Sequence, residues 1–291
     1  GAGFGGLYAI YRLRELGLKV IGIEAAADVG GTWYWNRYPG ARCDIPSLFY
    51  SYTWSEELRR EWRWSEKYAA QPEILRYLGF VADRYDLRRD IRFGTKVTQA
   101  TWDDASERWL IATNNGANVS CRYYIMATGC LSSPKPPEID GVKNFKGEIY
   151  FTGRWPHQGV DLKGKRVAVI GTGASAIQFV PKVQKQAAHI DLYQRTPPWI
   201  MPKPDREITD SERKMFKRFP ATQRAFRSAI YWMLESRVAG FVINPRLMKV
   251  VERVARSHIR KQIMDPELRR KVTPDYTIGC KRVLISDDYY P

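Results

Sequence analysis

The sequence Gly-Ala-Gly-Phe-Gly-Gly at residues 1–6 decides the fold, and a second copy of its pattern, Gly-Thr-Gly-Ala-Ser-Ala, occupies residues 171–176. Both match the dinucleotide-binding fingerprint. Its first glycine allows a tight turn, its second lets the backbone approach a pyrophosphate, and its third position must be small for helix–strand packing. A single fingerprint is weak evidence, because an ordinary glycine-rich turn also matches it. The three positions are Gly1, Gly3 and Gly6 in the first copy and Gly171, Gly173 and Ala176 in the second.

The segments around each copy strengthen this interpretation. Apolar residues at helical spacing follow the first copy, Gly17 is placed to end that helix, and residues 18–24 predict a buried parallel strand. Around the second copy, residues 166–170 predict the incoming strand, 174–184 a helix and 190–193 the outgoing strand. We therefore expect an α/β fold with two Rossmann-like dinucleotide-binding domains.

The residue that ends each unit predicts its cofactor. Counting 23 residues from the first glycine reaches Glu24 in the first copy and Gln194, directly followed by Arg195, in the second. A carboxylate at this position accepts hydrogen bonds from a ribose diol, whereas an arginine pairs with a 2′-phosphate. The first copy therefore predicts FAD and the second NADPH. A solvated arginine at a strand end is the alternative for Arg195.

Length and composition limit the other classes of protein. The 291 residues allow two domains, and no apolar run approaches the length of a membrane span. Four cysteines and three histidines share no metal-ligand spacing, so we expect no metal site, reduced thiols and a cytoplasmic location. The first fingerprint begins at residue 1, without the strand that should precede it. We therefore expect the chain to be a fragment.

The net charge of +16 raises nucleic acid as a partner, but its distribution argues against one. Residues 205–271 hold 17 Lys and Arg against 8 Asp and Glu, in a segment whose apolar residues have helical spacing. A solvated helical face is the interpretation we favour. An entrance that attracts NADPH and a polyanion-binding surface are the two alternatives.

The remaining segments predict a loop, a helix and several strands. The loop at residues 30–44 is rich in aromatic residues, Gly and Pro, as ligand-binding loops at the ends of parallel strands often are. Gln71 and Pro72 are placed to start a helix. The expected strands are an antiparallel meander of 91–97, 100–102 and 109–113, and a buried strand at 123–126 before the turn Ala127-Thr128-Gly129.

We expect four domain segments. Residues 1–140 form the FAD-binding domain, lacking its first strand and a C-terminal part, and 141–204 form the first part of the NADPH-binding domain. Residues 205–271 form a helical insert, with Trp232, Met233 and Val238 on its core side, and 272–291 return to the NADPH-binding domain.

These motifs together resemble one family. The two fingerprints, the aromatic loop with Asp44, the Ala127-Thr128-Gly129 turn and the Lys281-Arg282 pair are similar to those of Baeyer-Villiger monooxygenases, a class B flavin-containing monooxygenase family. The resemblance covers essentially the whole chain. It implies an enzyme with FAD as cofactor that uses NADPH and O2 to convert a ketone into an ester or lactone through a C4a-peroxyflavin. It implies neither a nucleic-acid partner nor a membrane span, and it leaves the oligomeric state open.

The resemblance also implies roles for individual residues. Arg282 lies where relatives place the arginine that supports the peroxyflavin, and Asp44 where they pair a carboxylate with it. A salt bridge between domains without a catalytic role is the alternative for this pair. Residues expected to hold NADPH are Gly171, Gly173, Ala176, Arg195, Thr196 and Lys281. Residues expected to hold FAD are Gly1, Gly3, Gly6 and Glu24, with Gly31, Thr32, Trp33 and Asp44 in the loop beside the flavin.

One position departs from the family pattern. This chain has Phe151 at the position of the histidine in the family signature FxGxxxHxxxW. We therefore expect the coupling of NADPH oxidation to oxygen transfer to be affected. Two other functions stay open from the residues: a flavin monooxygenase that oxygenates nitrogen or sulfur, and a truncated chain that binds a dinucleotide without catalysis.

Overall fold

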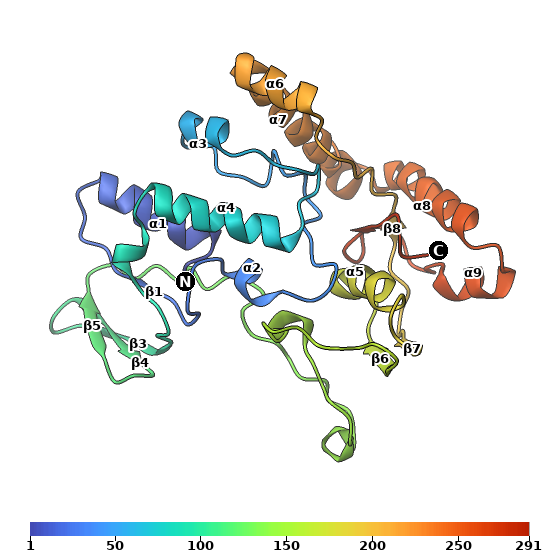
Figure 1. The fold of residues 1–291 in the computed structure, drawn as a ribbon, viewed down its shortest axis with the longest axis horizontal. Coiled ribbons are helices and arrows are strands. Elements are labelled where there is room, and N and C mark those ends of the chain that lie inside the picture. Colours follow the sequence, from blue (N-terminus) through green and yellow to red (C-terminus); the bar gives the residue numbers. More distant parts are fainter. Residues whose placement is uncertain (291) are drawn as a thin grey trace. The chain divides into compact units, whose positions relative to one another are not determined.

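The computed structural model describes residues 1–290, apart from the side chains of residues 239, 241 and 245 (Figure 1). The chain divides into two compact units. Unit 1 comprises Gly1–Tyr38 and Gln71–Gly159, and unit 2 comprises Pro39–Ala70 and Val160–Pro291. Residues 39–70 thus group with unit 2, although the sequence placed them in the FAD-binding domain. The limits of the functional domains stay a prediction.

Helix α1 (Phe4–Glu15) follows the first glycine turn, as its apolar spacing predicted. It ends in a Schellman motif. Gly17 has a φ of 74°, its amide donates to the carbonyl of Arg14, and the amide of Leu18 donates to the carbonyl of Leu13. Glycine is favoured here because a left-handed residue must follow the last turn of the helix.

A parallel strand pair and two helices make the first nucleotide unit. Strand β1 (Gly22–Ile23) pairs in parallel with β2 (Ile91–Arg92). Helix α4 (Gln71–Arg84) begins at Gln71, as predicted, and lies beside α1 (Figure 1). The ring pair Phe4–Tyr77, with centroids 6.2 Å apart, joins the two helices, and Tyr11 packs at 5.0 Å against Tyr85, which directly follows α4.

The antiparallel meander exists, but the prediction of its first strand at 91–97 was wrong, and its last strand was not predicted. Strands β3 (Val97–Asp103), β4 (Arg108–Thr113) and β5 (Asn118–Cys121) form it in the order β3-β4-β5. The predicted strand at 91–97 instead contributes β2 to the parallel pair. The polar composition of β5 gave little strand signal, although Asn115-Gly116 before it is typical of a hairpin turn.

Two further predictions in unit 1 were wrong about burial. Leu18 and Ile21 are exposed, and only Gly22–Ile23 of the predicted strand 18–24 is assigned as a strand. Residues 123–126 form no strand, and Tyr123 and Met126 are 74% and 72% exposed. An apolar run becomes a buried strand only where a neighbour pairs with it, and none among residues 1–290 pairs with 123–126. Short 3-10 turns complete the unit at Arg88–Asp90 (η1), Val142–Asn144 (η2) and Thr152–Arg154 (η3).

Unit 2 contains the second nucleotide unit in the predicted order. Strand β6 (Arg166–Ile170) leads into the glycine turn, α5 (Ala174–Val183) follows it, and β7 (His189–Tyr193) pairs in parallel with β6 over its whole length. The alternation of parallel strands with helices in both units confirms the α/β class.

A second parallel pair lies further along unit 2. Strand β8 (Ile200–Met201) pairs with β9 (Leu284–Ile285), which returns to the nucleotide unit after the helical insert. Ile200 and Leu284 pack with Ile177 of α5 in one buried cluster. Trp199 packs with Met248, Ala255 and Ile278 in another. These two clusters fix the ends of β8 and β9 against α5 and the insert.

The insert is helical, as predicted. Its elements are α6 (Asp210–Arg218), α7 (Pro220–Glu235), η4 (Ala239–Ile243), η5 (Pro245–Leu247), α8 (Met248–Gln262) and α9 (Pro266–Val272), and α3 (Glu56–Glu61) also belongs to unit 2. The predicted core side was wrong, because Trp232, Met233 and Val238 are exposed. Among the residues that the structure describes, no helix has both the length and the apolar character that a bilayer span requires.

Candidate functional site

The first glycine turn is enclosed by its own unit. A Cβ on Gly6 would collide with the carbonyl oxygen of Gly1, and a Cβ on Gly1 would collide with the carbonyl oxygen of Ala127. The small-residue turn at 127–129 therefore lies directly against the fingerprint. No residue larger than glycine fits at Gly1 or Gly6 without a backbone shift.

Glu24 lies at the end of β1 with its carboxylate buried against this turn. The side chain is 6% exposed, Oε2 accepts a hydrogen bond from the amide of Ala2 at 2.6 Å, and Oε1 accepts from the amide of Ala26 at 2.8 Å. A buried carboxylate needs such donors. Each oxygen keeps a further lone pair that could accept a ribose hydroxyl.

The aromatic loop begins on the same turn. Gly31 has a φ of 52°, and a Cβ there would lie 2.8 Å from the Cα of Gly3. The amide of Gly30 donates to the carbonyl of Ala2 at 2.9 Å. Helix α2 (Thr32–Trp35) then buries Trp33, whose carbonyl accepts a hydrogen bond from the side-chain amide of Gln71. Gly3, Gly31, Thr32 and Trp33 are thus brought together in unit 1.

The signature segment lies beside this loop. The guanidinium of Arg154 lies 4.3 Å from the ring centroid of Trp35, and the ring of His157 packs edge-on against Tyr34 at 4.8 Å. Burial and the charge of Arg37 lower the pKa of His157 below its ordinary value. Phe151 is half-buried, and its carbonyl accepts from the amide of Arg154.

The second glycine turn is open. Gly171 has a φ of 100°, and among residues 1–290 no atom beyond the chain neighbours lies within 4 Å of a Cβ built on Gly171 or on Gly173. Ala176 is buried, as the third fingerprint position requires. No side chain caps the N-terminus of α5, so its first amides keep free donors. Open space above free amides at a helix N-terminus fits a pyrophosphate.

The residues predicted for a 2′-phosphate gather beyond this turn. The Thr172 hydroxyl donates to the carbonyl of Thr196 at 3.4 Å, and the Tyr276 hydroxyl donates to the carbonyl of Pro197 at 3.1 Å. The Lys281 ammonium lies 4.8 Å from the centroid of the Tyr276 ring. Tyr276 therefore links Lys281 to the segment that follows Arg195. Arg195 is exposed and has no carboxylate partner among residues 1–290.

Asp44 and Arg282 form an ion pair within unit 2, between Asp44 Oδ2 and the guanidinium of Arg282. The Arg282 side chain is 63% exposed and that of Asp44 is 29% exposed. A paired, solvent-accessible arginine keeps donors for another anionic or polar group.

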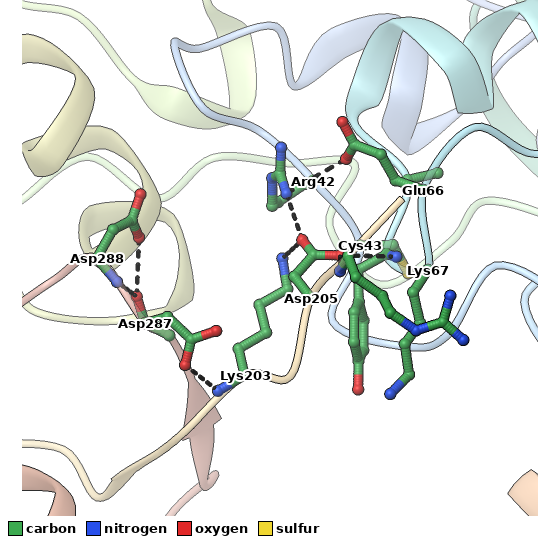
Figure 2. Close-up of polar contacts among 12 residues, drawn as sticks. Arg42, Cys43, Glu66, Lys67, Lys203, Asp205, Asp287 and Asp288 are labelled. Carbon is green, nitrogen blue, oxygen red and sulfur yellow. Dashed lines mark hydrogen bonds and ion pairs between the residues drawn. The ribbon is translucent and has the colours of Figure 1, made fainter. Parts of the chain in front are cut away.

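The same unit contains a polar cluster that no sequence motif predicted. Arg42, Lys203 and Asp205 meet in ion pairs (Figure 2), although they lie up to 163 positions apart and no spacing rule connects them. The neighbouring Cys43 is buried, and burial raises the pKa of its thiol to about 12. Cys43 is therefore a packing residue rather than a nucleophile. Within residues 1–290, no group of His, Cys, Asp and Glu is arranged to hold a metal ion.

The chain is similar to known proteins along its whole length. Residues 1–224 match the family of pyridine nucleotide-disulphide oxidoreductases. A Baeyer-Villiger monooxygenase of Pseudomonas aeruginosa is 49% identical over 292 residues, which cover 100% of this chain and 54% of the relative. The chain thus spans about half the length of this curated relative.

Two solved structures resemble the whole chain. One is described as oxidized steroid monooxygenase bound to NADP, with a TM-score of 0.90, 42% identity and coverage of 100% of this chain and 62% of that one. The other is described as OTEMO in complex with FAD and NADP, with a TM-score of 0.89, 35% identity and the same coverage.

Proposed function

Because the chain belongs to the pyridine nucleotide-disulphide oxidoreductase family, we propose that it is the nucleotide-binding part of a flavin monooxygenase. The complete enzyme converts a ketone, O2, NADPH and a proton into an ester or lactone, NADP⁺ and water. The similarity to the Pseudomonas aeruginosa Baeyer-Villiger monooxygenase supports this reaction. The single observation that carries the proposal is the Asp44–Arg282 ion pair, which lies in the same unit as the open glycine turn.

The two glycine turns hold different dinucleotides in this proposal. Glu24 accepts hydrogen bonds from the adenosine ribose of FAD, and the turn at residues 1–6 faces its pyrophosphate. The turn at 171–176 receives the pyrophosphate of NADPH, while Arg195 and Lys281 pair with its 2′-phosphate. When bound, FAD supplies the redox chemistry that links NADPH oxidation to O2.

Arg282 has the catalytic role. Its guanidinium keeps its positive charge at every physiological pH and presents donors in a fixed fork. It stabilises the negative charge that develops on the carbonyl oxygen of the ketone as oxygen adds to the carbonyl carbon. Asp44 holds this guanidinium in place through their ion pair. Loss of one such donor costs about 3 kcal/mol, or roughly 100- to 1000-fold in rate.

The proposed location is the cytoplasm. All four cysteines are free thiols, as expected for a reducing compartment.

The test follows the oxygen atom in the full-length protein. The protein is loaded with FAD and supplied with NADPH, a panel of ketones and ¹⁸O2, and esters are analysed by mass spectrometry. We expect one ¹⁸O in the ester for each NADPH oxidised. Arg282→Ala should lose most of the ester, whereas Arg270→Ala, which removes an exposed arginine of α9, should not. Hydrogen peroxide in place of ester from every ketone, or oxygenation of sulfides and amines alone, would contradict the proposal.

Phe151 favours a second candidate, an enzyme that oxidises NADPH and releases hydrogen peroxide instead of oxygenating a ketone. It replaces the histidine of the signature described above. If this candidate holds, the wild-type protein releases peroxide and Phe151→His raises the ester formed per NADPH. Unchanged product ratios in Phe151→His would argue against it.

A further inference from the structure

The polar cluster of Arg42, Lys203 and Asp205 has one carboxylate at its centre (Figure 2). Asp205 Oδ2 accepts from the Arg42 guanidinium at 2.6 Å and from the Lys203 ammonium at 2.7 Å. Asp205 Oδ1 accepts from the backbone amides of Tyr68 at 3.3 Å and Arg206 at 3.0 Å. Each carboxylate oxygen of Asp205 therefore accepts one hydrogen bond from residues 42–68 and one from residues 203–206.

The two cations depend on this carboxylate. The Lys203 side chain is 9% exposed, and burial lowers the pKa of its ammonium while the hydrogen bond to Asp205 raises it. Arg42 has a second partner, Glu66, at 3.4 Å. Without Asp205, a buried ammonium would face a guanidinium with less compensation, and an uncompensated buried charge is strongly unfavourable. Asp205 therefore holds the two cations side by side.

The Arg42 side of the cluster leads to Asp44. Only Cys43 separates the two residues, so their Cα atoms lie within about 7 Å along the chain. Cys43 is buried, and its amide donates to the carbonyl of Ala69 at 3.0 Å. The main chain of Arg42 also exchanges hydrogen bonds with the side chain of Gln178 on α5, at 3.1 and 3.2 Å. The position of Arg42 thus limits where the backbone of Asp44 can lie.

The Lys203 side leads to Arg282. Lys203 follows β8, which pairs with β9, and its amide donates to Asp287 Oδ1 at 2.6 Å. Arg282 lies two residues before β9. The same cluster therefore fixes the segment that carries Asp44 and the segment that carries Arg282.

We propose that Asp205 is a positioning residue that keeps Asp44 and Arg282 within reach of each other by holding Arg42 and Lys203. Asp205 contacts neither of the two, and acts through the chain segments on either side of it. The effect of Asp205 on the reaction rests on the proposed function of Arg282. Its effect on the positions of Asp44 and Arg282 is independent of that function.

The test uses Asp205→Asn in the full-length flavoprotein, because this change removes the charge and keeps the size. We expect at least a fivefold loss of ester formed per NADPH oxidised, with partial recovery in Asp205→Glu. In the background of Asp44→Ala, the Asp205→Asn change should have almost no further effect, because without Asp44 there is no longer a pair with Arg282 for Asp205 to keep together. The matched control is Asp210→Asn on α6, which removes an exposed carboxylate of the same unit and should leave the ester yield unchanged.

A second readout does not need turnover. Hydrogen exchange at the Cys43 amide should become at least fivefold faster in Asp205→Asn, while amides of β6 and β7 keep wild-type rates. Arg42→Gln, which leaves the Lys203–Asp205 pair in place, should produce the same exchange change if Asp205→Asn does not fold. If the wild-type protein makes no ester, the proposed function fails and the exchange rates still decide the positioning role. Equal losses in the wild-type and Asp44→Ala backgrounds, or unchanged exchange at Cys43, would overturn the proposal.

Discussion

The two glycine turns share a sequence pattern but differ in what surrounds them. The turn at residues 1–6 is enclosed, since side chains built on Gly1 and Gly6 would collide with backbone oxygens. The turn at 171–176 is open, since a Cβ on Gly171 or Gly173 would meet no atom of the described residues beyond its chain neighbours. The polar residues at the two strand ends differ in the same way: Glu24 is buried and bonded, whereas Arg195 is exposed.

The same glycine pattern therefore serves two physical purposes. In the first turn the glycines are required by the protein's own packing, which fixes the shape of the turn before any ligand binds. In the second they leave space that a ligand can use. A rigid turn suits a tightly held cofactor, and an open turn suits a substrate that must bind and leave in each cycle.

The largest expected difference is in the tolerance of the turns to a methyl group. Gly6→Ala forces a Cβ into the Gly1 carbonyl oxygen, and we expect it to lower the free energy of unfolding by about 3 kcal/mol or more. Gly173→Ala has room, and its φ of −76° suits alanine, so its change should stay within about 0.5 kcal/mol. Chemical denaturation of both variants measures this, and equal destabilisation would break the comparison.

The next effect concerns the residues at the strand ends. Glu24→Ala leaves the amides of Ala2 and Ala26 without their acceptor, so we expect a loss of about 1–3 kcal/mol in the free energy of unfolding. Arg195→Ala should change it by less than about 0.5 kcal/mol. Glu24→Gln, which keeps one acceptor oxygen, is the control and should fall between the two. A stability loss in Arg195→Ala as large as that in Glu24→Ala would show that the arginine is structural.

A smaller effect is expected on the choice between coenzymes. Arg195→Ala should lower the preference for NADPH over NADH, measured as the ratio of kcat/KM values, by roughly 10- to 100-fold, because a charge-assisted hydrogen bond contributes about 1.5–3 kcal/mol. The exposed arginine that begins β6 provides the control: Arg166→Ala should leave the ratio unchanged. An unchanged ratio in Arg195→Ala would support the alternative of a solvated strand-end arginine.

The smallest effect is the dependence on salt. Arg195 and Lys281 are exposed, so added salt should weaken their attraction for the 2′-phosphate as the Debye length falls from about 30 Å at 0.01 M to about 10 Å at 0.1 M. We expect the Kd of NADP⁺ to rise a few fold over this range and the Kd of FAD to stay nearly constant. Calorimetric titration at several salt concentrations measures both. The same salt slope for the two cofactors would contradict an open second site.

Local sequence patterns predicted the parts of the fold that depend on local physics. The helix after each fingerprint, the helix start at Gln71 and the parallel pairing of β6 with β7 follow from periodicity and turn chemistry, and the structure confirms them. Burial was harder to predict. Tyr123 and Trp232 are large aromatic residues of the kind found in protein cores, yet both are exposed. Their burial depends on whether another segment packs over them.

The site residues also differ in whether local sequence patterns could predict them. The fingerprint positions and Glu24 could be numbered by spacing alone, and the resemblance to a known family pointed to Asp44 and Arg282. The centre of the cluster, Asp205, could not be predicted, because its ion pair with Arg42 spans 163 positions and leaves no periodic signal. In the sequence, a paired aspartate cannot be told from one whose charge is solvated.

The most direct test of whether each glycine turn binds its own cofactor is to measure the binding of both cofactors to two variants. Dissociation constants for FAD and for NADP⁺ are measured in full-length Glu24→Ala and Arg195→Ala. We expect that Glu24→Ala weakens FAD binding and leaves NADP⁺ binding unchanged, and that Arg195→Ala weakens NADP⁺ binding and leaves FAD binding unchanged. Variants that each weaken both cofactors equally, or that act on the opposite one, would contradict it.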